Sequence, residues 1–132
     1  MRAYYINVAS RTDRRDAMEA RLLAVGVSAQ RIDAVTDSDV RPEQRARYCD
    51  PTARRWTSVR ELTCSLSHIK AMLAFLATDE EHAVIFEDDV LLSSALAQFL
   101  DEFERSPHGV DLLRLETDNS RLRVPPAAER ST

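Results

Sequence analysis

Short apolar segments alternate along the chain with segments whose apolar residues repeat at helical spacing. Residues 2–8 are rich in aromatic and β-branched side chains and predict a buried strand. Cap-type residues follow, and apolar side chains then recur at helical spacing up to Gly26, which predicts a helix. Such an alternation favours a mostly parallel sheet with helices on its faces. We therefore expect an α/β fold whose ligands gather at the carboxyl ends of the strands.

The middle of the chain predicts a second strand, a long loop and a second helix. The strand is expected to include residues 32–35, and residues 37–57 predict a loop with one helical turn at 42–48. Ser58 and Glu61 have the spacing of a capping box at a helix start. The apolar residues that follow repeat at alternating steps of four and three: Leu62, Leu66, Ile69, Leu73 and Leu76. This leucine stripe predicts a helix that packs on the core.

The last third of the chain continues the alternation. Residues 83–86 predict a strand, and residues 95–103 predict a helix capped by Ser93 or Ser94. Residues 110–115 predict a further strand. We expect one domain over residues 1–117, and a flexible tail, or the start of a missing part, over residues 118–132.

Composition excludes several classes of protein. The chain has 132 residues, 44% of them hydrophobic and 30% charged, which is typical of a soluble globular domain. Its net charge of −4, without a basic stripe interleaved with aromatics, argues against nucleic acid as a partner. Its apolar stretches are too short to cross a bilayer and no signal-peptide pattern opens the chain, so we expect a cytoplasmic protein. Cys49 and Cys64 predict two reduced thiols.

Three adjacent carboxylates directly follow the apolar run at 83–86. The acidic triplet Glu87-Asp88-Asp89 can offer oxygens to a hard divalent cation, which often completes its shell with water and substrate phosphates. A solvated acidic turn after a strand is the alternative. The position of the triplet inside an apolar run favours the cation site.

A second group of reactive side chains lies near the start of the helix that follows Ser58. On a helical wheel, one flank carries Glu61, Cys64, Ser65 and His68, so a Cys-His-Glu metal site is geometrically conceivable. A small buried thiol beside a hydrogen-bonded histidine is the alternative. His68 could also donate a hydrogen bond to a phosphate or a substrate hydroxyl.

The loop after the first strand is polar and opens a helix. Residues 7–15 contain three arginines, and backbone N–H groups at a helix start together with arginine forks can hold an anion or a nucleotide. Helix caps and surface arginines explain the same pattern. With only two glycines, the chain cannot contain a glycine-rich phosphate loop.

Taken in order, these segments resemble the successive motifs of glycosyltransferase family 25, the lipooligosaccharide-type sugar transferases. The resembling segments are Tyr5-Ile6-Asn7-Val8 with residues 11–15, residues 31–35, residues 64–68 and residues 85–90, and residues 111–115 resemble the next strand of the family. The resemblance implies a GT-A-like, Rossmann-like fold and an inverting hexosyltransferase. It also implies a UDP-galactose or UDP-glucose type donor, a lipooligosaccharide-like glycan acceptor, and manganese or magnesium.

The resemblance also implies roles for individual residues. Glu87, Asp88 and Asp89 would bind the metal and the donor, with Asp89 the first choice for direct ligation. The remaining donor-binding residues would be Asn7, Ser10, Arg11, Asp13, Arg14, Ser67 and His68. Catalysis would rest on Asp89, Asp88 and a general base, for which Glu116 or Asp118 is the candidate because both lie just past the last predicted strand.

Members of the family continue beyond the end of this chain, so we expect it to represent only the N-terminal, donor-binding part. Two alternatives stay open beside an active transferase. The chain could be a truncated or degenerate relative that binds nucleotide without turnover, or an unrelated metal-dependent phosphoryl-transfer or hydrolase domain. Peripheral association with the inner membrane and oligomer formation are also open.

Overall fold

A parallel sheet forms the centre of the fold, as the sequence predicts, and in the described residues it has three strands. The computed structural model describes residues 1–106 and 109–115. The sheet has the order β2-β1-β3, with β1 (Arg2–Asn7), β2 (Gln30–Asp33) and β3 (Ala83–Glu87). The helical elements are α1 (Thr12–Val25), the 3-10 turn η1 (Asp37–Asp39), α2 (Pro42–Tyr48), α3 (Val59–Leu76) and α4 (Leu96–Arg105). The α/β fold with a parallel sheet is therefore confirmed.

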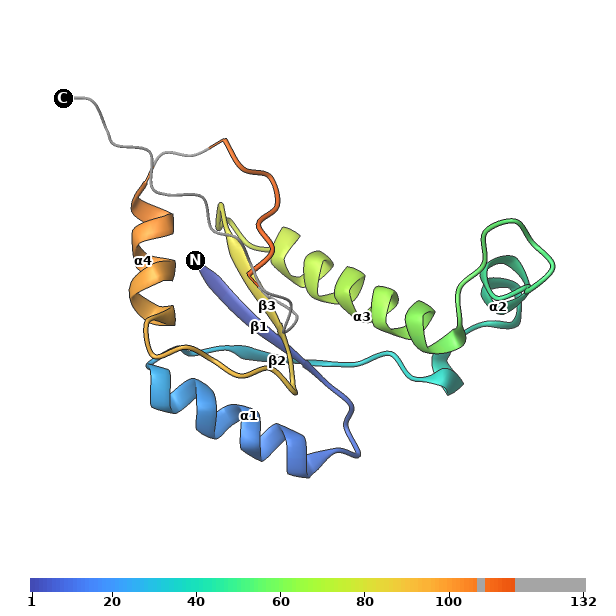
Figure 1. The fold of residues 1–132 in the computed structure, drawn as a ribbon, viewed down its shortest axis with the longest axis horizontal. Helices are drawn as coiled ribbons and strands as arrows, with labels where there is room; N and C mark the ends of the chain where they lie inside the picture. The colour runs from blue at the N-terminus through green and yellow to red at the C-terminus, as the bar shows by residue number, and fades with distance from the viewer. Residues whose placement is uncertain (107–108, 116–132) are drawn as a thin grey trace, which may run out of the picture.

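The helices cover both faces of the sheet. On one face α1 and α4 pack over a core group that contains Tyr5, Met18 and Phe86. On the other face α3 packs over a second core group that contains Tyr4 and Ala71. Figure 1 shows this arrangement, with α1 and α4 on one side of the strands and α3 on the other. Both groups arise because successive residues of a strand point to opposite faces.

The carboxyl ends of the strands meet at one edge of the sheet. Ile6 is level with Glu87 across the β1·β3 pair, and Asn7 is level with Asp33 across the β1·β2 pair. The chain leaves β1 toward β2 and later returns to β3 on the opposite side of β1. The loops after β1 and β3 therefore flank the point where the strand order reverses, which is where open α/β sheets bind ligands.

The helix boundaries largely follow the predicted signals. Gly26 ends α1 in the left-handed conformation at φ 74°, and Ser58 with Glu61 forms the predicted capping box of α3. The predicted serine cap of α4 is wrong: the helix begins at Leu96 after Ala95, which lacks a side-chain cap bond. Ser93 Oγ instead accepts a hydrogen bond from the Ala95 N–H at 3.2 Å. Among the described residues, no helix combines the length and the apolar character that a membrane crossing requires.

The leucine stripe of α3 does not face the sheet as the sequence predicts. Leu62 is buried, but Ile69, Leu73 and Leu76 are 49%, 61% and 72% exposed. The face that meets the sheet carries Ser67 and Ala71 instead. Small side chains allow a helix to approach the strands closely, and this contact determines the orientation of α3.

The predicted strand at residues 110–115 is wrong. These residues form no regular element in the structure, and Leu112 is 83% exposed. Apolar residues favour a strand, but a strand also needs a neighbour for its backbone hydrogen bonds, and this segment pairs with none of β1, β2 or β3. Residues 107–108 and 116–132 lie outside the described residues, so the predicted boundary at 117, the tail and Glu116 stay untested.

Replacing Tyr5 with phenylalanine is expected to flatten the decline of stability at alkaline pH. The Tyr5 hydroxyl donates to Glu19 Oε1 at 2.6 Å, and burial, followed by that hydrogen bond, raises the pKa of Tyr5 to about 12. The pKa of Tyr5 in the folded protein exceeds the ordinary value of about 10. The protonated hydroxyl therefore contributes its full stabilisation below about pH 10, and this stabilisation is lost as the pH rises toward 12. Urea unfolding between about pH 8 and about pH 11 measures this decline.

The exposed tyrosine offers a control for this pH effect. Tyr48 is 43% exposed, and Tyr48→Phe should leave the decline as steep as in the wild type. An equally steep decline in Tyr5→Phe would contradict the prediction.

Candidate functional site

Strand alternation separates the side chains of the acidic triplet. In β3, Val84 and Phe86 belong to the core group under α1, whereas Ile85 packs with the group under α3. Continuing this alternation places Asp88 on the α1 side and Glu87 on the α3 side. The hydrogen bonds agree, because Asp88 contacts Arg14 of α1 while Glu87 contacts His68 of α3.

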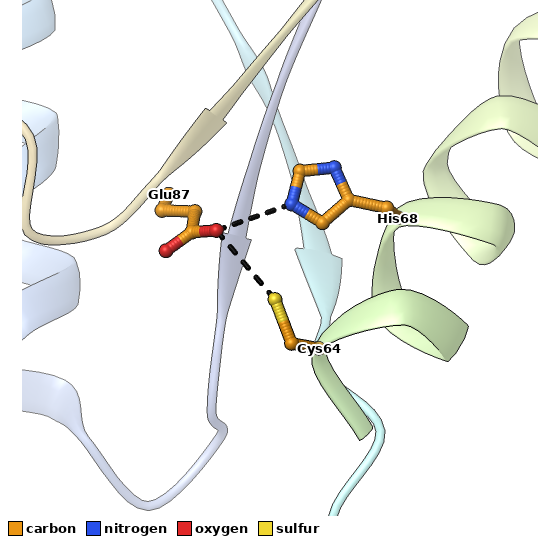
Figure 2. Close-up of side chains that lie close together, drawn as sticks. All are labelled: Cys64, His68 and Glu87. Carbon is orange, nitrogen blue, oxygen red and sulfur yellow. Dashed lines mark hydrogen bonds and ion pairs between the residues drawn. The ribbon is translucent and has the colours of Figure 1, made fainter. Parts of the chain in front are cut away.

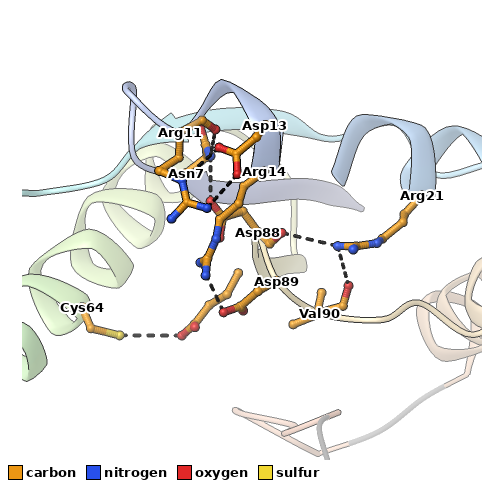
Figure 3. A network of polar contacts seen from close by, with 10 residues as sticks. Asn7, Arg11, Asp13, Arg14, Arg21, Cys64, Asp88, Asp89 and Val90 are labelled. Carbon is orange, nitrogen blue, oxygen red and sulfur yellow. Dashed lines mark hydrogen bonds and ion pairs between the residues drawn. The ribbon is translucent and has the colours of Figure 1, made fainter. Parts of the chain in front are cut away.

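On the α1 side, Asn7, Arg14 and Asp88 form a polar network at the strand ends (Figure 3). Asn7 Nδ2 donates to Asp88 Oδ2 at 2.6 Å, and Arg14 donates to Asp88 Oδ1 at 3.1 Å. Asn7 is 1% exposed and Asp88 is 8% exposed. Asp89, more exposed, contacts the same Arg14 nitrogen at 3.4 Å. The structure thus brings together four of the predicted site residues, two buried and two reachable from solvent.

Two arginines that sequence reasoning missed support this network. Arg31 of β2 donates through Nε to Asn7 Oδ1 at 3.1 Å. Arg21 of α1 donates to the backbone carbonyls of Asp88 and Val90 at 3.5 and 3.3 Å, which fastens the loop after β3 to the helix. Arg31 lies in a segment that resembles a family motif, but its spacing in the sequence does not connect it with Asn7, and nothing in the sequence distinguishes Arg21. Their roles depend on the strand order.

Arg11 and Asp13 pair with each other at the start of α1. Arg11 Nε and an Nη donate to the two Asp13 carboxylate oxygens at 2.9 and 2.7 Å. This fork lowers the pKa of Asp13 to about 2. Both side chains are exposed, and Asn7 Nδ2 holds the loop by donating to the Arg11 carbonyl at 3.1 Å.

On the α3 side, Glu87 meets Cys64 and His68 (Figure 2). Glu87 Oε1 lies 3.2 Å from His68 Nε2 and 3.6 Å from Cys64 Sγ. Partial shielding of the sulfur from solvent, and then the charge of Glu87, raise the pKa of the Cys64 thiol. The acid predicted for this flank, Glu61, is not part of the group, because its carboxylate accepts hydrogen bonds from Ser58 and Thr57. Of the predicted alternative, the hydrogen-bonded histidine is confirmed, whereas the buried thiol is wrong, since Cys64 is exposed.

Ser67 and Ser10 lie apart from the triplet's contacts. Ser67 is buried, accepts from the Val35 N–H at 2.8 Å and donates to the Thr63 carbonyl at 2.7 Å, so it joins α3 to the end of β2. Ser10 lines an open depression of about 540 Å³ at the ends of β1 and β2, together with Asp33 and Lys70. The depression could not be predicted from sequence because its walls come from three separate segments.

Comparison with known proteins places these features in a family. The family model described as glycosyltransferase family 25 (LPS biosynthesis protein) matches residues 1–126. A human protein named inactive glycosyltransferase 25 family member 3 is 30% identical over 123 residues, 87% of this chain and 20% of the relative. A Drosophila melanogaster glycosyltransferase 25 family member is 27% identical over 97 residues, 67% of this chain and 16% of the relative. The chain thus spans a fifth or less of these relatives, and no solved structure matches it.

Proposed function

The chain belongs to glycosyltransferase family 25, and on this premise we propose that it binds a nucleotide-diphosphate sugar at the carboxyl ends of β1 and β3. In this proposal the donor is a UDP-galactose or UDP-glucose type hexose, and the acceptor is a sugar of a cell-surface glycan such as lipooligosaccharide. The observation that carries the proposal is the buried contact of Asn7 with Asp88, which holds Arg14 and Asp89 at the switch point of the sheet. Family membership removes the third alternative, an unrelated hydrolase.

Arg14 and Asp89 have the charges that a metal-bound diphosphate requires. Asp89 can bind the cation, and Arg14 can bind the phosphate anion. Manganese and magnesium usually take one or two protein carboxylates, several waters and substrate phosphates. The Asp89 side chain is 57% exposed and can supply one such carboxylate. The Arg14 side chain is 41% exposed, and an arginine has further N–H groups for a phosphate oxygen. Both carboxylate oxygens of Asp88 instead accept hydrogen bonds, one from Asn7 and one from Arg14. The role of Asp88 in this proposal is therefore to position these two side chains.

The nucleoside part of the donor would occupy the neighbouring depression. The loop after β1 lines the depression through Ser10 and also leads to Arg11 and Arg14 at the start of α1. Asp33 at its edge can accept hydrogen bonds from ribose hydroxyls, as acidic residues do in dinucleotide-binding folds. One loop could therefore contact both ends of the donor.

Transfer itself would be inverting, with an acceptor hydroxyl attacking the sugar as the diphosphate leaves. A bound divalent cation would supply charge neutralisation of the departing diphosphate. The protein would contribute position, through the network that fixes Asp89 and Arg14. The general base stays a prediction at Glu116, outside the described residues.

Nucleotide binding without turnover is the second candidate. The human relative is described by its name as inactive, and this chain spans only a fifth of that protein. Both candidates predict donor binding at Asp89. They differ in whether free nucleotide is released from the donor when an acceptor sugar is supplied.

Thermal unfolding with UDP and manganese is the experiment that tests donor binding. At a ligand concentration about 100 times the Kd, a ligand specific to the folded state adds about 2.7 kcal/mol, which raises Tm by roughly 5–10 °C in a domain of this size. We expect this rise only when manganese is present. Asp89→Asn should remove most of it, because the neutral amide is a weaker ligand for the cation.

A control variant separates this effect from a general loss of surface charge. Asp101 is an exposed carboxylate on α4 that pairs with Arg105 at 3.5 Å, and Asp101→Asn should keep the full rise in Tm. A rise that is independent of manganese, or that survives in Asp89→Asn, would be evidence against the proposed site. No rise with UDP or any other nucleoside diphosphate would end the proposal.

A further inference from the structure

Three side chains that suit a transition metal come together between α3 and the end of β3. Cys64 Sγ, His68 Nε2 and a Glu87 carboxylate oxygen all lie within 4.8 Å of one another. Cys64 and His68 are four residues apart on α3, so they project from the same side of the helix. Figure 2 shows Glu87 reaching toward both of them from the strand. In the described part of the chain, no other His, Cys, Asp or Glu group of three converges in this way.

Two of the three separations are close to those between ligands of a tetrahedral metal, and the third, between the Cys64 sulfur and the imidazole nitrogen, is at most 4.8 Å. Zinc lies about 2.1 Å from nitrogen and oxygen ligands and about 2.3 Å from sulfur, so tetrahedral ligand atoms are about 3.4–3.6 Å apart. The Glu87 oxygen lies 3.2 Å from His68 Nε2 and 3.6 Å from Cys64 Sγ. An ion could thus contact all three with small rotations of the side chains.

The chemistry of this trio differs from that of a manganese or magnesium site. Thiolate and imidazole ligands favour zinc, cobalt or copper, whereas magnesium and manganese favour oxygen. The Glu87 carboxylate is half-exposed and His68 is 32% exposed, so water or another small molecule can reach the same place. Strand alternation turns Glu87 away from Asp88, which separates this trio from the network on the α1 side.

We propose that Cys64, His68 and Glu87 bind one divalent transition-metal ion, zinc or a metal of similar preference, with the fourth position open to water or a substrate oxygen. This site is independent of the proposed donor site. It assigns Glu87 to the α3 side and leaves Asp89 to the donor's cation. Binding displaces the thiol proton, because a coordinating cysteine is a thiolate.

Cobalt titration of the metal-free full chain, with the thiols kept reduced, tests the proposal. Cobalt can replace zinc in such a site, and its absorption spectrum depends on which ligands bind it. A thiolate gives a charge-transfer band in the near ultraviolet, and tetrahedral coordination gives intense visible bands. We expect both sets of bands to saturate at one equivalent and to disappear when zinc is added. Cys64→Ser should remove the charge-transfer band, and His68→Gln or Glu87→Gln should weaken binding at least tenfold, since even loss of an indirect support costs 10–100-fold.

Two control variants make the result specific to this trio. Cys49 is the other free cysteine, and Cys49→Ser should leave the charge-transfer band intact. Asp89→Asn should also leave it intact, which distinguishes this site from the donor's cation. Circular dichroism checks that each variant keeps its fold.

Three outcomes would overturn the proposal. The first is the absence of a charge-transfer band at any cobalt concentration. The second is a band that persists in Cys64→Ser and is lost in Cys49→Ser. The third is that His68→Gln and Glu87→Gln leave cobalt binding unchanged. The three side chains would then be joined only by hydrogen bonds of the thiol and the imidazole with the Glu87 carboxylate. None of these depends on nucleotide binding, so the donor proposal stands or fails separately.

Discussion

Replacing Asn7 with alanine is expected to lower the free energy of unfolding by about 2–4 kcal/mol. An unsatisfied buried polar group costs about 1–3 kcal/mol, and more when the group is charged. Asn7 donates to the Arg11 carbonyl and to Asp88, and it accepts from Arg31. Within the described ranges, its removal leaves the Asp88 carboxylate, which is 8% exposed, with Arg14 as the remaining side-chain donor. Urea unfolding followed by circular dichroism measures the loss.

A surface amide provides the matched control for this substitution. Gln98 on α4 is exposed and donates to Glu102 at 2.7 Å, so Gln98→Ala should cost no more than about 0.5 kcal/mol. A double-mutant cycle of Asn7→Ala with Asp88→Ala should show coupling, because the two changes remove the same hydrogen bond. If Asn7→Ala costs no more than Gln98→Ala, or if the two changes simply add, the network does not hold the site together.

The same substitution links stability to donor binding. Asp88 positions Arg14, and Arg14 also contacts Asp89, so a loosened Asp88 should weaken nucleotide binding even though Asn7 lies below the surface. Stability and binding should fall together in Asn7→Ala. Asp89→Asn should reduce binding alone, because its side chain is exposed.

The meeting of distant residues at the strand ends could be predicted from sequence. Parallel strands bring their carboxyl ends to one edge, so the segment that starts at Asn7 and the acidic triplet that ends β3 are predicted at the same edge, and there Asn7 contacts Asp88. The division of the triplet was not predicted, although its signal is present. A strand alternates its faces, so adjacent residues such as Glu87 and Asp88 cannot share a side while the strand continues.

The partners of Glu87 were harder to predict. Two acids, Glu61 and Glu87, could have joined Cys64 and His68, and sequence spacing alone favours the acid on the same helix. The capping box removes Glu61 from that choice, because its carboxylate is taken up by the helix start. The choice also requires knowing which face of the sheet α3 covers, and that depends on tertiary packing.

The orientation of α3 shows where periodicity stops being informative. The helix carries apolar residues on more than one side, and the leucine stripe has the larger side chains. The sheet contacts the side with Ser67 and Ala71 instead, and Ser67 fixes this choice by bonding the Val35 N–H. A hydrophobic pattern indicates that a helix packs on something, but it does not identify which side packs on a small three-stranded sheet.

Substitutions on the two sides of α3 should therefore test which side packs on the sheet. We expect a loss of stability on the side of Ala71 and little change on the side of the leucine stripe. Ala71 is 0% exposed in the core group with Tyr4 and Ile32, so Ala71→Leu should lower the free energy of unfolding by about 1–3 kcal/mol through overpacking. Leu73 is 61% exposed, so Leu73→Ala should change it by less than about 0.5 kcal/mol. Urea unfolding of both variants measures the contrast.

If Leu73 instead lay in the core, Leu73→Ala would cost more stability than Ala71→Leu. Truncating a buried leucine to alanine costs about 2–5 kcal/mol, and an exposed alanine tolerates leucine because both are good helix formers. A large loss in Leu73→Ala with little change in Ala71→Leu would mean that α3 is rotated about its axis. Cys64 and His68 lie on the same helix as Ala71 and Leu73, so they would turn with it. Such a rotation would therefore also move Cys64 and His68 away from Glu87. The unfolding measurement thus tests the geometry on which the metal site depends, without any metal present.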